Sequence, residues 1–130
     1  MLSSFLRKQE SPYLAGMGYV YIVTNKHRTV LYIGVTNDIE RRICEHKAGV
    51  GSSFSSKFKC TFLLYHQQYM TIVEAIEAEK QMKKWKRDWK IELIKQNNPD
   101  MLDLAADWFT EEQLKSAVDE YKRRKLETEA

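Results

Sequence analysis

The 130-residue sequence has little of what cross-links or interrupts a chain, with two cysteines, two prolines and five glycines. Cys44 and Cys60 form neither a disulfide framework nor a metal-binding spacing, so we expect a reducing, cytoplasmic setting. No apolar run approaches the roughly 20 residues that cross a bilayer, and we expect no membrane partner. The first residues also lack an apolar stretch of the length that a secretory signal needs.

Basic charge is concentrated in one part of the chain. Residues 1–99 hold 16 Lys and Arg against 9 Asp and Glu, whereas residues 100–130 hold 5 against 9. Residues 80–95, here called the basic stripe, carry 7 basic and 2 acidic side chains with Trp85 and Trp89 among them. This pattern is typical of a surface that binds nucleic-acid phosphates, although a solvated helix face accounts for the charge equally well.

Local sequence patterns predict the order of the secondary structure. Runs of β-branched and aromatic residues predict a hairpin of strands 19–24 and 29–36 around a turn at 25–28, and a third strand at 59–69 after a flexible loop at 49–58. Helices are expected at 38–48, 71–85, 87–96 and from Thr110 into the 120s. This order indicates an α+β fold, a small three-stranded antiparallel sheet flanked by helices, with an extra charged C-terminal helix.

Composition also suggests how the chain is divided. Residues 1–17 show little pattern and are expected to form a disordered leader, residues 18–104 the main domain, and residues 105–130 an acidic helical extension. Thr71, with Glu74 three residues later, forms a capping box that predicts the start of a helix.

The predicted hairpin separates two kinds of side chain. With a four-residue turn, Tyr21 lies opposite Tyr32 and Tyr19 opposite Gly34. Alternation then places these tyrosines and the glycine on one face of the sheet and the aliphatic side chains on the other. One face is therefore phenolic, with a gap at Gly34.

The helix at 38–48 carries a guanidinium and an imidazole where apolar side chains are expected. Arg42 and His46 lie within about 60° of Ile39 on a helical wheel, and they neighbour each other because they are four residues apart. Arg41 points elsewhere. For each residue alone, the ordinary interpretation is an arginine along the edge of the core and a hydrogen-bonded core histidine.

The helix at 71–85 contains a similar exception. Glu79 falls in the apolar stripe of Ala75 and Met82, where a carboxylate costs free energy unless it is paired or bound to a cation. Two interpretations remain open: Glu79 pairs with Arg42 or Lys83, or it is the carboxylate ligand of a hard cation such as Mg²⁺.

The tyrosines, the Arg42–His46 pair and Glu79 together provide the kinds of group that hydrolysis of a phosphodiester uses. That reaction needs a group that activates water, a cation that holds charge on the phosphate, and a donor to the transition-state oxygens.

The motifs also resemble a known family. Tyr19-Val20-Tyr21, ten further residues and then Tyr32-Ile33-Gly34 resemble the paired motif of the GIY-YIG nuclease superfamily, and the second arginine of the following helix, Arg42, matches the catalytic arginine of that family. The similarity extends over residues 18–104. It is greatest to the small single-domain bacterial branch and to the nuclease domain of the excinuclease C subunit.

The resemblance implies roles for the tyrosines and for the glycine. Tyr21 would act as the general base on water, as a transient phenolate, and Tyr32 would assist or orient it. Gly34 would leave room for the scissile phosphate.

The resemblance also implies roles for the charged residues. Arg42 would stabilise the pentacovalent phosphate, His46 would orient water or tyrosine, and Glu79 would bind a single Mg²⁺ or Mn²⁺. The implied activity is that of a metal-dependent endonuclease that cleaves DNA by a one-metal mechanism. Candidate contacts to the DNA backbone are Lys83, Lys84, Lys86, Arg87 and Lys90.

Two other functions stay open on the sequence. A nucleic-acid-binding module of the same fold, without catalysis, would keep the basic stripe but lack a competent site. A protein-interaction domain would direct the stripe to an acidic partner or to the acidic extension of the same chain.

Overall fold

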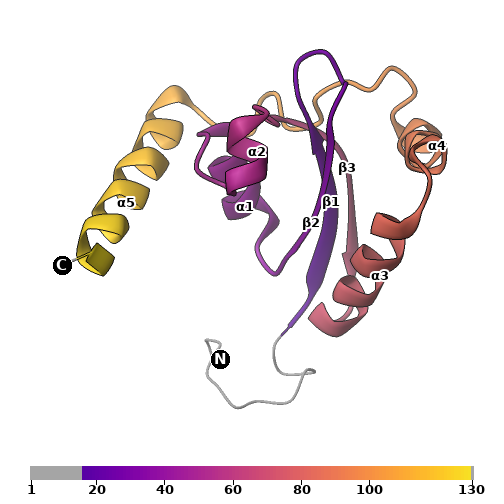
Figure 1. Cartoon of the computed structure of the whole chain (residues 1–130), viewed down its shortest axis with the longest axis horizontal. Helices are drawn as coiled ribbons and strands as arrows, with labels where there is room; N and C mark the ends of the chain where they lie inside the picture. The colour runs from indigo at the N-terminus through magenta and orange to yellow at the C-terminus, as the bar shows by residue number, and fades with distance from the viewer. Residues whose placement is uncertain (1–15, 130) are drawn as a thin grey trace.

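The computed structural model describes residues 16–129, and the expected leader lies almost entirely outside this range. Three strands form one antiparallel sheet in the order β2-β1-β3, with helices on both of its faces (Figure 1). The elements are β1 (Gly18–Thr24), β2 (Leu31–Thr36), α1 (Ile39–Lys47), α2 (Ser53–Lys57), β3 (Phe62–Tyr69), α3 (Ile72–Lys84), α4 (Arg87–Asn97) and α5 (Glu111–Glu129). The α+β fold predicted from the sequence is thereby confirmed.

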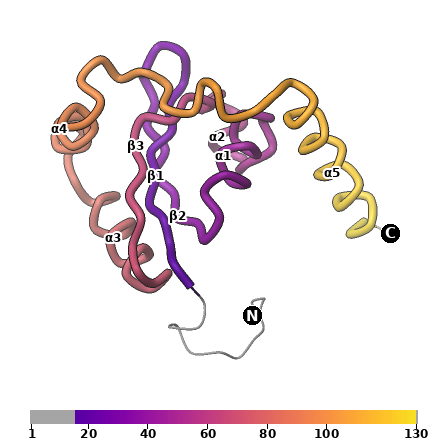
Figure 2. Tube along the Cα trace, turned by 180° about the vertical axis from the view of Figure 1, so that it is seen from behind, coloured from indigo at the N-terminus to yellow at the C-terminus, as the bar shows by residue number. Residues whose placement is uncertain are grey.

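The central strand β1 is buried on both faces, so two cores meet at it. Val20 and Ile22 pack with Ala75 of α3 and Ile94 of α4. On the other face, the side chain of Tyr21 packs in a second core with Ile43 of α1 and with Ala105, which follows α4. Seen from the opposite side, α1 and α2 again lie on one side of the sheet, and α3 and α4 on the other (Figure 2).

The hairpin has a longer connection than predicted, and its register differs by two residues. Tyr21 lies opposite Gly34, and Tyr32 lies opposite Val23. Oδ1 of Asn25 accepts hydrogen bonds from the backbone N–H groups of Thr29 and Val30, at 2.8 and 3.1 Å, which keeps those two residues out of the ladder. Because the shift is an even number of residues, the assignment of side chains to faces is unchanged.

The segment 49–58, predicted as a flexible loop, contains the short helix α2. Oγ of Ser52 caps it by accepting a hydrogen bond from the backbone N–H of Ser55 at 3.1 Å. Ser55 of this helix is buried. A serine cap can start a helical turn without any apolar periodicity, which explains why the pattern missed it.

The starts of α3 and α5 agree with the sequence, whereas α1 starts at Ile39 with Asp38 as its N-cap, one residue later than predicted. The Thr71–Glu74 capping box is present at α3. Thr110 and Gln113 form the equivalent pair at α5, with the Thr110 N–H donating to Oε1 of Gln113 at 2.8 Å and the Gln113 N–H donating to Oγ1 of Thr110 at 3.2 Å. Extended backbone at Trp85 separates α3 from α4.

Replacement of Asn98 by Ala should destabilise the fold. The buried Asn98 amide donates to the carbonyl oxygens of Leu64 and Leu102, at 3.1 and 2.8 Å, and its Oδ1 accepts from the N–H of Leu102 at 3.0 Å. Asn98→Ala should therefore lower the free energy of unfolding by about 1–3 kcal/mol, measured by urea titration, because it leaves buried backbone groups without partners. The matched control is Asn97→Ala on the exposed end of α4, and equal stability of the two variants would contradict the assignment.

Candidate active site

A buried tyrosine, a histidine and an arginine meet between the sheet and α1. The hydroxyl of Tyr21 lies 2.7 Å from Nε2 of His46. Nε of Arg42 donates a hydrogen bond to the same hydroxyl at 3.2 Å. Tyr21 and His46 are both buried, so protein groups take the place of water around this oxygen. We call these three residues the Tyr–His–Arg cluster.

Helix α1 delivers two of the three side chains because Arg42 and His46 are one turn apart on its inner side. Ile43 anchors that side in the core. NH1 of Arg42 also donates to Oε1 of Glu45 at 3.0 Å, which fixes the guanidinium at a second point. Arg41 is about half exposed and pairs with acids on its own helix surface.

Tyr32 lies beside the cluster and connects it to the surface. The centroid of its ring is 6.4 Å from that of Tyr21 and 5.4 Å from that of His46. The ring stacks on exposed Phe54 of α2, with centroids 6.0 Å apart. Tyr32 therefore forms a wall between the buried cluster and the solvent-facing side of α2.

Gly34 allows the Tyr21 ring to pack closely against β2. A Cβ atom added at this position would collide with the hydroxyl and Cζ of Tyr21. The space at the Cβ position of Gly34 is thus filled by the Tyr21 ring, and the expected role of this glycine toward a phosphate stays a prediction. The close approach follows from the observed register, which puts Gly34 directly opposite Tyr21.

The sequence reasoning missed one polar contact of the cluster. Oγ of Ser55 lies 2.9 Å from Nδ1 of His46, on the side of the ring away from Tyr21. The repeated serines of this segment signal a local cap between Ser52 and Ser55. Nothing in the spacing shows that the cap packs against α1.

Burial sets the protonation of the cluster. Desolvation raises the pKa of Tyr21 to about 12, although the Arg42 guanidinium acts in the opposite direction. Desolvation also lowers the pKa of His46 to about 4, and the positive charge of Arg42 contributes. At neutral pH the phenol and the imidazole are therefore both uncharged.

Glu79 belongs to a helix on the opposite face of the sheet from the cluster. Helix α3 packs on the Val20 and Ile22 face of the sheet, whereas Tyr21 packs on the other face. Oε2 of Glu79 lies 2.9 Å from Nζ of Lys83, and the Glu79 side chain is 13% exposed. The structure thus shows one of the two pairings that the sequence left open for this carboxylate.

The donor set around Glu79 bears on an implied metal ion. No group of three or more His, Cys, Asp or Glu side chains that could hold a metal ion occurs among residues 16–129. A single hard carboxylate fits Mg²⁺ or Mn²⁺ only as a cation that is shared with substrate phosphate oxygens and keeps most of its water. Glu79 is therefore compatible with Mg²⁺ or Mn²⁺ bound in this way.

A hollow of about 330 Å³ along the outer edge of β2 connects the two sides of the sheet. Its lining residues are Leu31, Tyr32, Ile33, Phe54, Lys83 and Lys90. The hollow therefore leads from the wall of the cluster at Tyr32 to the basic stripe at Lys83, one turn of α3 beyond Glu79.

The basic stripe occupies the end of α3 and most of α4. Lys84 and Lys86 are exposed. Lys83 pairs with Glu79, and NH2 of Arg87 donates to the carbonyl oxygen of Arg28 at 3.0 Å. Lys84 and Lys86 are thus the candidates least engaged by the protein itself.

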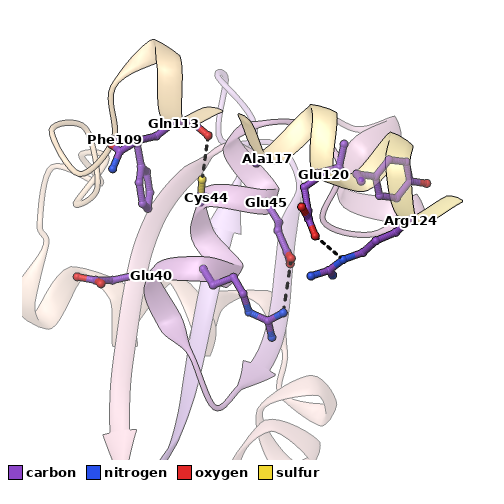
Figure 3. A pocket seen from close by; sticks show the side chains of 11 residues that line it. Glu40, Cys44, Glu45, Phe109, Gln113, Ala117, Glu120 and Arg124 are labelled. Atoms are coloured by element: carbon purple, nitrogen blue, oxygen red, sulfur yellow. Dashed lines mark hydrogen bonds and ion pairs between the residues drawn. The ribbon is translucent and has the colours of Figure 1, made fainter. Parts of the chain in front are cut away.

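The C-terminal helix α5 does not cover this stripe. It packs against α1, on the side of the sheet opposite α3 and α4 (Figures 1 and 2). A cavity of about 300 Å³ lies between α1 and α5, with Cys44 and Glu45 on one wall and Glu120 and Arg124 on the other (Figure 3). The idea that the stripe binds the acidic extension of its own chain is wrong for this arrangement.

Fold, cluster and hairpin motif together indicate a nuclease-type domain. Residues 17–92, more than half of the chain, match the family model described as the GIY-YIG catalytic domain. The chain therefore belongs to the GIY-YIG family. Helix α5 lies outside the matched residues.

Similar proteins are known from bacteria. A UPF0213 protein of Staphylococcus haemolyticus is 33% identical over 78 residues, which are 60% of this chain and 94% of that protein. A UPF0213 protein of Staphylococcus saprophyticus is 36% identical over 76 residues, 58% of this chain and 92% of its own length. No solved structure matches the chain. Within residues 16–129, every helix is too short or too polar to cross a lipid bilayer.

The neutral His46 should make stability depend on pH. Its pKa is lowered from 6.5 to about 4 in the folded protein, so between these values the unfolded chain binds more protons and stability falls as the pH falls. The loss attributable to His46 is up to about 3 kcal/mol at pH 4 relative to pH 7. Urea unfolding at both pH values should show a smaller loss for His46→Gln than for wild type. The control His27→Gln, at an exposed site, should keep the wild-type loss; equal losses in all three proteins would contradict the assignment.

Proposed function

We propose that this protein is a metal-dependent endonuclease that hydrolyses phosphodiester bonds in DNA by a one-metal mechanism. The observation that carries the proposal is the Tyr–His–Arg cluster, with Tyr21 joined to His46 and Arg42 inside a GIY-YIG catalytic domain. The three groups are a proton donor and acceptor pair and a permanent cation, which are the types that phosphoryl chemistry uses.

In this proposal Tyr21 acts as the general base after it passes its proton to Nε2 of His46. The proton moves along the existing 2.7 Å contact and leaves a phenolate beside an imidazolium. Because burial raises the pKa of Tyr21 and lowers the pKa of His46, this transfer is unfavourable in the free protein. Phenolate formation therefore requires additional positive charge in the complex with substrate.

Arg42 supplies a permanent part of that charge. Its Nε donates a hydrogen bond to Tyr21 and its Nη1 donates one to Glu45, which leaves Nη2 to donate to a phosphate oxygen. A guanidinium held at two points needs little reorganisation when negative charge develops on the phosphate. Tyr32, at the wall of the cluster, would orient the attacking water.

Glu79, together with phosphate oxygens and water, would hold the divalent cation, which would neutralise charge on the phosphate and the leaving group. Lys83 would then exchange its contact with Glu79 for one with the DNA backbone. The exposed Lys84 and Lys86, with Arg87 and Lys90, would bind further phosphates. Because backbone contacts carry no sequence information, binding should be indifferent to sequence.

The alternative is a nucleic-acid-binding module of the same fold without catalysis. The ion pair between Glu79 and Lys83 favours it, since a carboxylate already paired within its helix needs no metal. Both functions share the basic stripe, and they differ only in whether DNA is cut.

Nicking of supercoiled plasmid with Mg²⁺ or Mn²⁺ separates the two functions. Arg42→Ala and Glu79→Gln should each lower the nicking rate by about 10²-fold or more, because each removes a group that stabilises transition-state charge. The matched controls are Arg41→Ala on the outer side of α1 and Glu77→Gln on the outer side of α3, both expected to remain within about twofold of wild type. No metal-dependent nicking by wild type would support the binding module, and nicking that survives both test substitutions would show that the site lies elsewhere.

Binding to DNA should depend strongly on salt through the basic stripe. The double variant Lys84→Ala/Lys86→Ala should reduce the slope of log K against log salt concentration by about 2, measured by fluorescence anisotropy with labelled duplex DNA. The control Lys122→Ala/Lys125→Ala removes the same charge from the exposed surface of α5 and should leave the slope unchanged. If the slopes of wild type and stripe variant coincide, the stripe does not bind the backbone.

A further inference from the structure

Helix α2 and the loop before it enclose the Nδ1 side of the His46 ring. Oγ of Ser55 lies 2.9 Å from Nδ1, and both side chains are at least 97% buried. A Cβ atom added to Gly51 would lie 2.5 Å from the same nitrogen, so the loop backbone also packs against this edge of the ring. Nδ1 therefore has Ser55 as its side-chain partner and no room for another group.

The proton of the Ser55 hydroxyl has acceptors on Ser52 as well as on His46. Oγ of Ser55 donates to the carbonyl oxygen of Ser52 at 3.4 Å, and Oγ of Ser52 donates to Oγ of Ser55 at 2.9 Å. When its proton is given to Ser52, the Ser55 oxygen faces Nδ1 as an acceptor. An acceptor at this distance requires Nδ1 to carry the proton.

The opposite edge of the ring leads to the same tautomer independently. Nε of Arg42 always carries a proton and donates it to the Tyr21 oxygen. The Tyr21 hydroxyl is then free to donate to Nε2 of His46 at 2.7 Å, which requires Nε2 to be unprotonated. A neutral ring protonated at Nδ1 thus satisfies both hydrogen-bond chains, the one through α2 and the one through Arg42.

We propose that Ser55, held by Ser52, is a positioning residue that fixes His46 in the Nδ1–H tautomer and thereby keeps Nε2 ready to accept the proton of Tyr21. The effect on cleavage rests on the proposed function, whereas the tautomer does not. In the other tautomer Nε2 would donate to Tyr21, and the phenol could not pass its proton to the ring. No other described side chain is within hydrogen-bond distance of Nδ1.

The tautomer can be read directly from the ¹⁵N chemical shifts of the His46 ring at pH 7, at which a ring with a pKa near 4 is neutral. Wild type should show a protonated Nδ1 and an unprotonated Nε2. Ser55→Ala should show a mixture of tautomers, and Ser55→Thr, which keeps the hydroxyl, should restore the wild-type shifts. The control Ser53→Ala, at an exposed position of α2, should leave them unchanged. Each variant is first checked for a cooperative thermal transition.

Plasmid nicking measured on the same variants tests the catalytic consequence. Ser55→Ala should lower kcat by about 10- to 100-fold with little change in KM, the size of effect typical for loss of a hydrogen bond that orients a functional histidine. A protonated Nε2 in wild type, unchanged shifts in Ser55→Ala, or an altered tautomer with unchanged kcat would each overturn the proposal. If wild type shows no nicking but the tautomer responds to Ser55→Ala, the positioning role stands and the proposed nuclease function fails.

Discussion

The hydroxyl of Tyr21 projects from a strand that is covered on both faces, so its hydrogen-bond partners must come from the protein itself. This one requirement constrains three other elements. Helix α1 has to present Arg42 and His46 one turn apart, β2 needs a residue without a side chain at Gly34, and α2 has to close over the far edge of the histidine. Changes in any of these elements act on the same oxygen.

Much of this arrangement follows from local sequence rules. Alternation in the hairpin put Tyr21, Tyr32 and Gly34 on one face, and it held because a register error of two residues preserves the parity of a strand. The helical wheel distinguished Arg42 from Arg41, because one apolar residue, Ile39, was enough to define the inner side of the helix. Periodicity and caps depend only on residues a few positions apart, so they do not change with the long-range contacts of the chain.

Other features depend on contacts that no pattern encodes. The register was set by the amide of Asn25, which takes two backbone N–H groups out of the ladder. Helix α2 arises from a serine cap without apolar periodicity, so its Ser55 could not be placed beside His46 from spacing. The wheel also put Glu79 in the inner stripe of α3 without telling which face of the sheet that helix would cover, and α3 covers the face away from Tyr21.

Helix α3, which carries Glu79, and the cluster lie on opposite faces of the sheet, and the two sides meet at the edge strand β2. Burial keeps Tyr21 protonated and His46 neutral, so charge that favours the phenolate has to arrive from outside the cluster. The hollow along β2 reaches from Tyr32 to Lys83, and β2 is an edge strand with no neighbour beyond it in the sheet. A phosphate bound along this edge would lie between the side of α1 and the side of α3. In the proposed function the substrate itself would then join the two halves of the site, and Tyr21 and His46 would stay uncharged until DNA is bound.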